Sequence, residues 1–125
     1  MSTGQLMDVE KTLLGLGGDE TLLGKVAQIF ARTAPDLLDL IGSALDADDL
    51  KRAYAEAHSL KGSVGVFDAP QVLQCVTDLA QRAKERDLAA TRESFAAARP
   101  LVERLLAEIT PLLSGNRAAA ASGRR

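Results

Sequence analysis

The stretch HSLKGSVGVF, residues 58–67, has flanks with the apolar spacing of an amphipathic helix, yet it contains two glycines and the only histidine of the chain. Each glycine inside a helix costs about 1 kcal/mol relative to alanine. At about 100° of rotation per residue, Leu60, Val64 and Phe67 share one side of this helix and His58 lies opposite. The histidine is therefore predicted to face away from the core.

Two missing side chains flank this histidine. Gly62 and Gly65 both fall within about 40° of His58 around the helix, so the surface beside the imidazole is expected to be low. A second protein could then reach the outer ring nitrogen. Gly65 has an alternative role as the residue that ends the helix. Lys51 and Tyr54 share this side of the helix. They are interpreted as contacts at the rim of the surface that a second protein would touch.

An exposed imidazole can act as a base, a metal ligand, a pH switch or a nucleophile. A hydrolytic triad needs an orienting acid, and none is apparent for His58 with Ser59 or Ser63. A zinc site needs three or four ligands, whereas Cys75 is the only cysteine, so no metal site is predicted. As a nucleophile toward a phosphoryl group, His58 needs little beyond exposure and a nearby cation, which Lys61 could supply.

Apolar spacing predicts helices before the quoted stretch. Asp8 can cap a short helix, and Gly17 and Gly18 supply the turn that follows it. From about residue 21 to 45, apolar residues again recur at helical spacing. This stripe, which includes Ile29, is assigned to the core.

Three further helical segments are predicted: the histidine helix at about 48–66, one that starts at Asp68 and Pro70, and one that ends near Leu112. Pro35 is expected to kink or split the earlier helix near Thr33, and Pro100 to kink or break the last one.

No run alternates in the manner of a strand. The predicted fold is all-α: an antiparallel four-helix bundle, up-down-up-down, with a short additional N-terminal helix.

Composition narrows the class of protein. Apolar residues make up 46% and aromatic residues only 3%, which indicates a core of Leu, Val, Ile and Ala. The net charge of -2 argues against nucleic acid as a partner. With one cysteine, no secretory signal and no apolar run long enough to span a membrane, a cytoplasmic protein is expected.

The segment AHSLKGSVGVF, residues 57–67, resembles the signature of histidine-containing phosphotransfer (HPt) domains, and the likeness extends over about residues 8–113. This resemblance implies that His58 carries a phosphoryl group on Nε2. Lys61 would help to hold that group, and Gly62 and Gly65 would provide clearance for a partner. The implied domain is preceded by a flexible N-terminus, residues 1–7, and followed by a disordered tail, residues 114–125.

The resemblance also implies partners and a mechanism. A response-regulator receiver domain, alone or in a hybrid sensor histidine kinase, would exchange phosphate between its aspartate and His58, with Mg²⁺ bound to the receiver. The chain itself would be a monomeric phosphate carrier without a cofactor, not an enzyme. Two positions depart from the family pattern. Asp68 stands where many members have glycine, and Ala80 where many have a Gln or Glu that orients the imidazole; Gln81 lies about 100° further round the helix.

Two alternatives remain open from the sequence. A helical adaptor or inhibitor with this scaffold could bind a kinase or receiver without transferring phosphate, and Ala80 is the feature that keeps this open. The phosphoacceptor bundle of a sensor kinase is a second alternative. There an acid typically follows the histidine, whereas this chain has Ser59.

Overall fold

The computed structural model describes residues 5–114, and these residues are helical without any strand. The elements are α1 (Val9–Gly15), α2 (Glu20–Asp46), α3 (Leu50–Val64), α4 (Pro70–Lys84), α5 (Leu88–Ile109) and the 3-10 turn η1 (Thr110–Ser114). The prediction of an all-α fold is confirmed.

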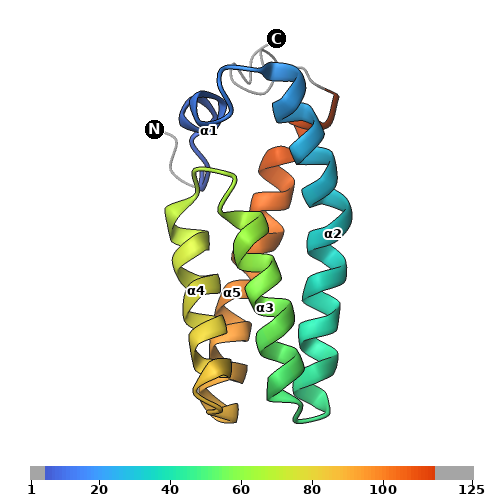
Figure 1. The fold of residues 1–125 in the computed structure, drawn as a ribbon, viewed down its shortest axis with the longest axis vertical. Helices are drawn as coiled ribbons and strands as arrows, with labels where there is room; N and C mark the ends of the chain where they lie inside the picture. Colours follow the sequence, from blue (N-terminus) through green and yellow to red (C-terminus); the bar gives the residue numbers. More distant parts are fainter. Residues whose placement is uncertain (1–4, 115–125) are drawn as a thin grey trace.

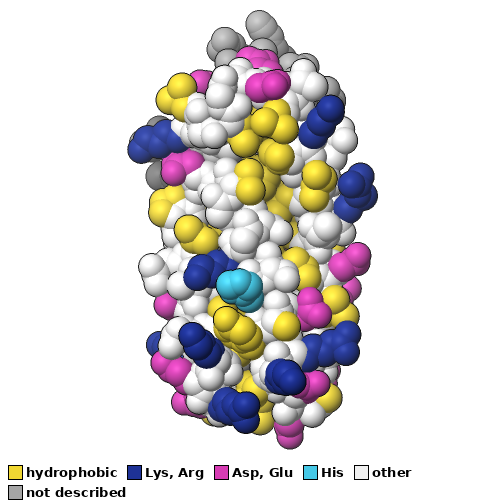
Figure 2. Space-filling model, viewed as in Figure 1, with side chains coloured by type: hydrophobic (Ala, Val, Ile, Leu, Met, Phe, Trp, Pro, Cys, Tyr) yellow, Lys and Arg dark blue, Asp and Glu magenta, His cyan; other side chains and the backbone are white. Residues whose placement is uncertain are grey.

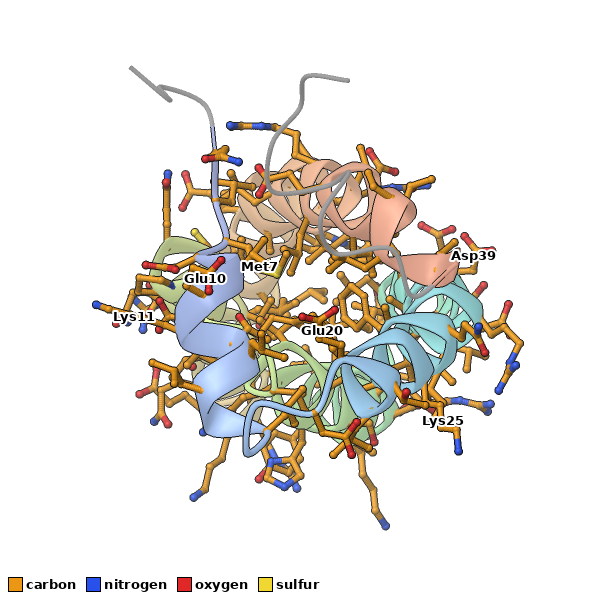
Figure 3. All side chains as sticks on the ribbon, turned by 90° about the horizontal axis from the view of Figure 1, so that it is seen from above. Met7, Glu10, Lys11, Glu20, Lys25 and Asp39 are labelled. Atoms are coloured by element: carbon orange, nitrogen blue, oxygen red, sulfur yellow. The ribbon has the colours of Figure 1, made fainter. Side chains whose placement is uncertain are left out.

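The four long helices form a bundle. Helix α3 packs against α2 and α4, and α5 packs against α4 and α2, which closes the ring. Figure 1 shows the chain direction reversing from each of these helices to the next, with α1 lying at the end where α2 begins and α3 ends. Figure 3 looks along the bundle: Met7 lies toward its interior, whereas Lys11, Lys25 and Asp39 lie on the outside.

Local sequence explains where the helices begin. Four of them start after an aspartate whose carboxylate accepts the backbone N–H three residues further on; these caps are Asp8, Asp19, Asp49 and Asp87. Helix α4 has Pro70 in its first turn. Backbone N–H groups in the first turn have no acceptor within the helix, so the N–H that proline lacks is not missed. The predicted glycine turn is also present, since Gly17 and Gly18 have φ of 75° and 76°.

Of the kink or break predicted at each proline, the break is wrong. Pro35 lies within the continuous helix α2 and Pro100 within the continuous helix α5. Each proline removes only one backbone donor, and both are exposed, so their rings do not disturb the core. In α2 the neighbours Ala34 and Leu38 are buried, and this packing continues through the proline.

The ordered part of the chain begins earlier than predicted. Leu6 and Met7, assigned to a flexible leader at residues 1–7, are buried. Their backbone N–H groups donate to the two carboxylate oxygens of Glu108, at 2.7 and 2.9 Å. This contact joins positions about a hundred residues apart, which local sequence does not reveal. Residues 1–4 and 115–125, which include nearly all of the predicted tail, lie outside the described residues.

The core has the predicted aliphatic composition and includes one aromatic pair. Phe30 from α2 and Phe67 after α3 meet edge to face, with ring centroids 5.1 Å apart. On α3 the residues Ala53, Ala57, Leu60 and Val64 have no solvent exposure. Burial of this side of α3 directs its opposite side to solvent.

Candidate functional site

The imidazole of His58 is exposed on the outer face of α3, as predicted. Figure 2 shows the histidine on the surface of the bundle, with apolar side chains gathered on the same face toward the end where α1 lies. Its α3 neighbours Ala57 and Leu60 point inward and are fully buried. The fold therefore presents the ring nitrogens to a visiting molecule.

One aromatic contact holds the imidazole. The rings of Tyr54 and His58 lie one helical turn apart, with centroids 5.8 Å apart and planes tilted by 30°. Tyr54 is only partly exposed because it packs against the hydrophobic core. Within residues 5–114, no hydrogen bond or ion pair to His58 accompanies this ring contact.

A shallow hollow of about 470 Å³ lies beside the histidine. Its lining comprises His58, Lys61, Gly62, Gly65, Val66 and Leu73, so residues of α3 and α4 contribute to it. Lys61 is partly buried and, among the described residues, forms no ion pair. Its ammonium group is thus available to an anion bound on this surface.

Neither glycine of the site is required by the backbone, because neither Gly62 nor Gly65 has a positive φ. A Cβ on Gly62 would meet nothing within 4 Å, so the space outside it is open. A Cβ on Gly65 would lie 3.4 Å from the Lys61 carbonyl, an ordinary contact. Gly65 also ends α3 as its C-cap, which confirms the alternative role. Gly62 therefore has no function in packing within the described chain.

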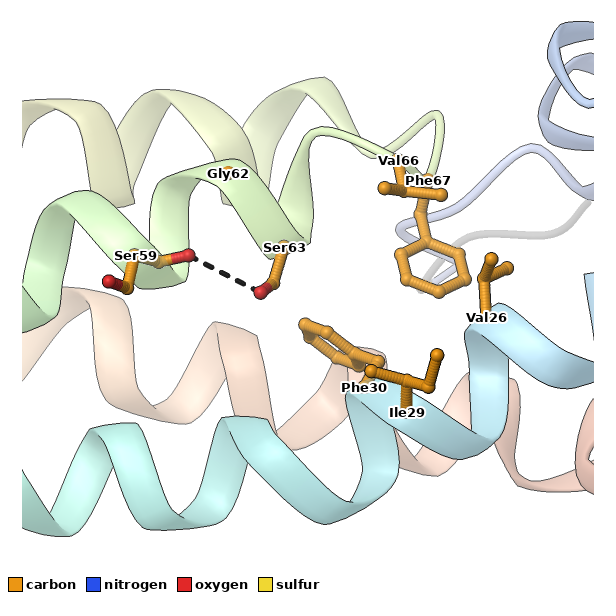
Figure 4. A pocket seen from close by; sticks show the side chains of 8 residues that line it. All are labelled: Val26, Ile29, Phe30, Ser59, Gly62, Ser63, Val66 and Phe67. Carbon is orange, nitrogen blue, oxygen red and sulfur yellow. Dashed lines mark hydrogen bonds between the residues drawn. The ribbon is translucent and has the colours of Figure 1, made fainter.

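An apolar groove of about 450 Å³ adjoins this hollow between α2 and the end of α3. Figure 4 shows Ile29 and Phe30 of α2 facing Val66 and Phe67 across it, while the Ser63 hydroxyl donates to the Ser59 carbonyl. The groove is lined by Val26, Ile29, Phe30, Ser59, Gly62, Ser63, Val66 and Phe67.

Two residues of this groove were not identified from sequence. Ile29, assigned to the core, is 51% exposed, and Val66 is 41% exposed. The available signal was the breadth of the apolar stripe in α2, which contains more apolar positions than one buried face can cover.

The model of the Hpt domain family matches residues 25–110, well over half of the chain. This chain belongs to the Hpt domain family. The matched span contains His58, Lys61, Gly62 and Gly65. No curated protein and no solved structure matched the chain in the corresponding searches.

Membership in the Hpt family fixes the broad role of the protein. Hpt domains take part in phosphotransfer within two-component systems, where they are phosphate-carrier modules rather than kinases and interact with receiver domains and histidine kinases. In the described part of the chain, no helix has both the length and the apolar character needed to cross a membrane.

The departure at Ala80 leaves the imidazole of this Hpt domain without a polar partner from α4. Ala80 is only 5% exposed and offers a methyl group. The neighbouring Gln81 is exposed, and its amide donates to the Glu85 carboxylate at 2.9 Å. Neither Ala80 nor Gln81 therefore provides a hydrogen bond that would orient His58.

The structure explains why aspartate can occupy position 68, where many Hpt domains have glycine. The Asp68 N–H donates to the hydroxyl of Thr12, and the Asp68 carbonyl accepts the N–H of Asp8, both at 2.8 Å. Asp68 is not in the left-handed region, so this turn does not require glycine. The buried Thr12, which sequence analysis missed, thus ties α1 to the turn that follows the histidine helix.

The remaining candidate ligands do not converge. Among residues 5–114 there is no group of three or more His, Cys, Asp or Glu side chains that could hold a metal ion. Cys75 is half-buried rather than fully inside the core. Desolvation, reinforced by the charge of Asp78, raises the pKa of the Cys75 thiol above its ordinary value. Its thiolate is therefore disfavoured.

Proposed function

We propose that this Hpt protein relays a phosphoryl group between His58 and the aspartate of response-regulator receiver domains. The supporting observation is the open space outside Gly62 beside an exposed imidazole, because the described chain has no packing use for a glycine there. In this proposal the bundle is an up-down-up-down four-helix scaffold that supplies a nucleophile and a docking surface. The protein acts as a monomer in the cytoplasm.

The transfer step needs little from the Hpt chain. The lone pair on Nε2 of neutral His58 forms a P–N bond as the P–O bond of the aspartyl phosphate breaks, and the electron pair of that bond stays on the departing carboxylate. The Nδ1 proton remains on the ring or passes to water. Lys61 lies one turn along α3 and would pair with the phosphoryl oxygens as a point charge. Mg²⁺ is expected on the receiver, and the carrier needs no cofactor of its own.

The receiver domain is expected to dock around the histidine. We define the docking face as Ile29, Gly62, Gly65, Val66 and Leu73, which line the two adjoining depressions. Exposed apolar side chains at its centre would be desolvated by a partner, and this contributes about 25 cal/mol per Å² of buried apolar surface. Gly62 and Gly65 would let the partner backbone approach the imidazole.

Transfer from a phosphorylated receiver domain tests the proposal. Label should move to the wild-type protein and not to the His58→Gln variant, and the phosphorylated product should be stable in base and labile in acid, as a phosphoramidate is. Far-UV circular dichroism of His58→Gln checks that the bundle is intact. Label on the variant, or on a residue other than His58, would exclude His58 as the acceptor.

Ala80 favours a second candidate function. A non-transferring adaptor or inhibitor would bind a kinase or receiver through the same docking face without needing an oriented imidazole. The same experiment separates the two functions. A wild-type protein that binds the receiver but takes no label from it would favour the adaptor. A stable dimer in sedimentation would instead favour the phosphoacceptor bundle of a sensor kinase.

A further inference from the structure

Transfer to an imidazole requires the ring to point Nε2 at the incoming phosphorus. His58 is exposed, and an exposed side chain on a helix can exchange among staggered rotamers. A hydrogen bond from α4 cannot fix the ring in this chain, because Ala80 offers only a methyl group and the Gln81 amide already donates to Glu85. The ring must be restrained by something else.

Tyr54 has the position and the rigidity for this task. It precedes His58 by four residues, so the two side chains lie on the same face of α3. The centroid separation of 5.8 Å falls within the range of aromatic pairs, and the 30° tilt brings the rings close to parallel. Tyr54 is itself anchored, because part of its side chain packs against the core.

We infer that Tyr54 is a positioning residue for His58, and that it orients the imidazole through ring contact rather than through a hydrogen bond. This inference rests on the proposed phosphotransfer function. Contact with the anchored tyrosine ring favours the rotamer in which the imidazole lies toward Tyr54, and disfavours the rotamers in which it swings away. Restriction of about three staggered states toward one raises the fraction of productive encounters by about threefold.

The aromatic ring of Tyr54 restrains the imidazole, and its hydroxyl group does not take part. Tyr54→Phe keeps the ring and should therefore transfer phosphate at the wild-type rate. Tyr54→Leu removes the ring and keeps an apolar side chain, and its maximal transfer rate should fall by about threefold. The receiver concentration at half-maximal rate should change by less than twofold, because Tyr54 is not one of the five docking-face residues and is expected to touch the receiver only at the rim of that face.

Nuclear magnetic resonance of the imidazole gives a readout that does not depend on transfer. The carbon-bound protons of His58 should experience the ring current of Tyr54 in wild type and in Tyr54→Phe, and should lose it in Tyr54→Leu. Tyr54→Met, which is unbranched and adapts to irregular space, serves as a second ringless variant if Tyr54→Leu fails to fold. Thermal unfolding identifies any variant whose bundle is lost.

Two results would overturn the inference: a folded ringless variant with the wild-type maximal rate, or imidazole signals that do not differ between wild type and that variant. Failure of the underlying function has a different signature. In that case wild type itself takes no label from the receiver, whereas the imidazole signals still report whether Tyr54 restrains the ring.

Discussion

Where α2 turns into α3, the guanidinium of Arg92 donates to the Leu45 carbonyl at 2.8 Å and to the Asp48 carboxylate at 2.7 Å. At the other end of the bundle, where α1 lies, Ile29 and Val66 keep 51% and 41% of their surface in solvent. At the first end, a polar side chain of α5 bonds to the turn between α2 and α3 within the chain. The second exposes apolar surface that costs free energy until a partner covers it, which is the arrangement expected of a binding site.

The largest expected effect on phosphate transfer is at Gly62, which borders the open space beside His58. Gly62→Leu should lower phosphate transfer by about 100-fold, because the new side chain holds the receiver away from the imidazole. The free energy of unfolding should rise by about 0.5 to 1 kcal/mol, since leucine is the better helix former and meets nothing within the chain. Transfer assays and urea unfolding on the same preparation measure both quantities.

Gly62→Ala is the matched control for this prediction, because a single methyl group is the smallest addition at the same position. Its transfer rate should lie between those of wild type and Gly62→Leu. Wild-type transfer by Gly62→Leu would show that the cleared surface has no role in approach of the partner.

A charge among the exposed apolar residues Ile29 and Val66 should weaken receiver docking without unfolding the bundle. Ile29→Asp is expected to weaken receiver binding by about 10-fold, which corresponds to about 1.4 kcal/mol, because a carboxylate would be desolvated in the interface. Unfolding stability should change by less than about 0.5 kcal/mol, as for most exposed positions. Calorimetric titration with the receiver gives the affinity.

Ala97→Asp on the exposed side of α5 is the control for Ile29→Asp, because it adds the same charge outside the docking face. It should bind the receiver like wild type. Equal weakening by both variants would point to net charge rather than to the apolar end as the cause.

The smallest effect is expected at Arg92, at the turn between α2 and α3, and it should change only the free energy of unfolding. Arg92→Ala removes one hydrogen bond to a backbone carbonyl and an ion pair that is largely exposed. The free energy of unfolding should fall by about 0.5 to 1 kcal/mol. Phosphate transfer should remain at the wild-type level, and a loss of transfer in the folded variant would show that the two ends are coupled.

Features set by neighbouring residues could be predicted from sequence. The cap at Asp8, the turn at Gly17 and the outward direction of His58 depend on interactions within a few residues or on one helical period. The shared face of His58, Gly62 and Gly65 could be predicted for the same reason, because these residues lie within two turns of one helix.

Features set by distant packing could not be predicted. Pro35 does not split α2, because the buried residues on either side of it pack against the rest of the bundle. Ile29 is exposed because α3 and the residues after it do not cover that side of α2. The ordering of Met7 depends on Glu108, and the role of Asp68 depends on Thr12. None of these pairings has a signal in local sequence.

The link between Thr12 and Asp68 bears on how fast a partner can associate. The Asp68 N–H donates to Thr12 and the Asp68 carbonyl accepts from Asp8, which fastens α1 and its cap to the turn after the histidine helix, so that turn is ordered before any complex forms. Binding then requires little loss of conformational entropy on the carrier side. The frequency of correctly aligned collisions, rather than a slow refolding of the loop, should limit how quickly the receiver engages.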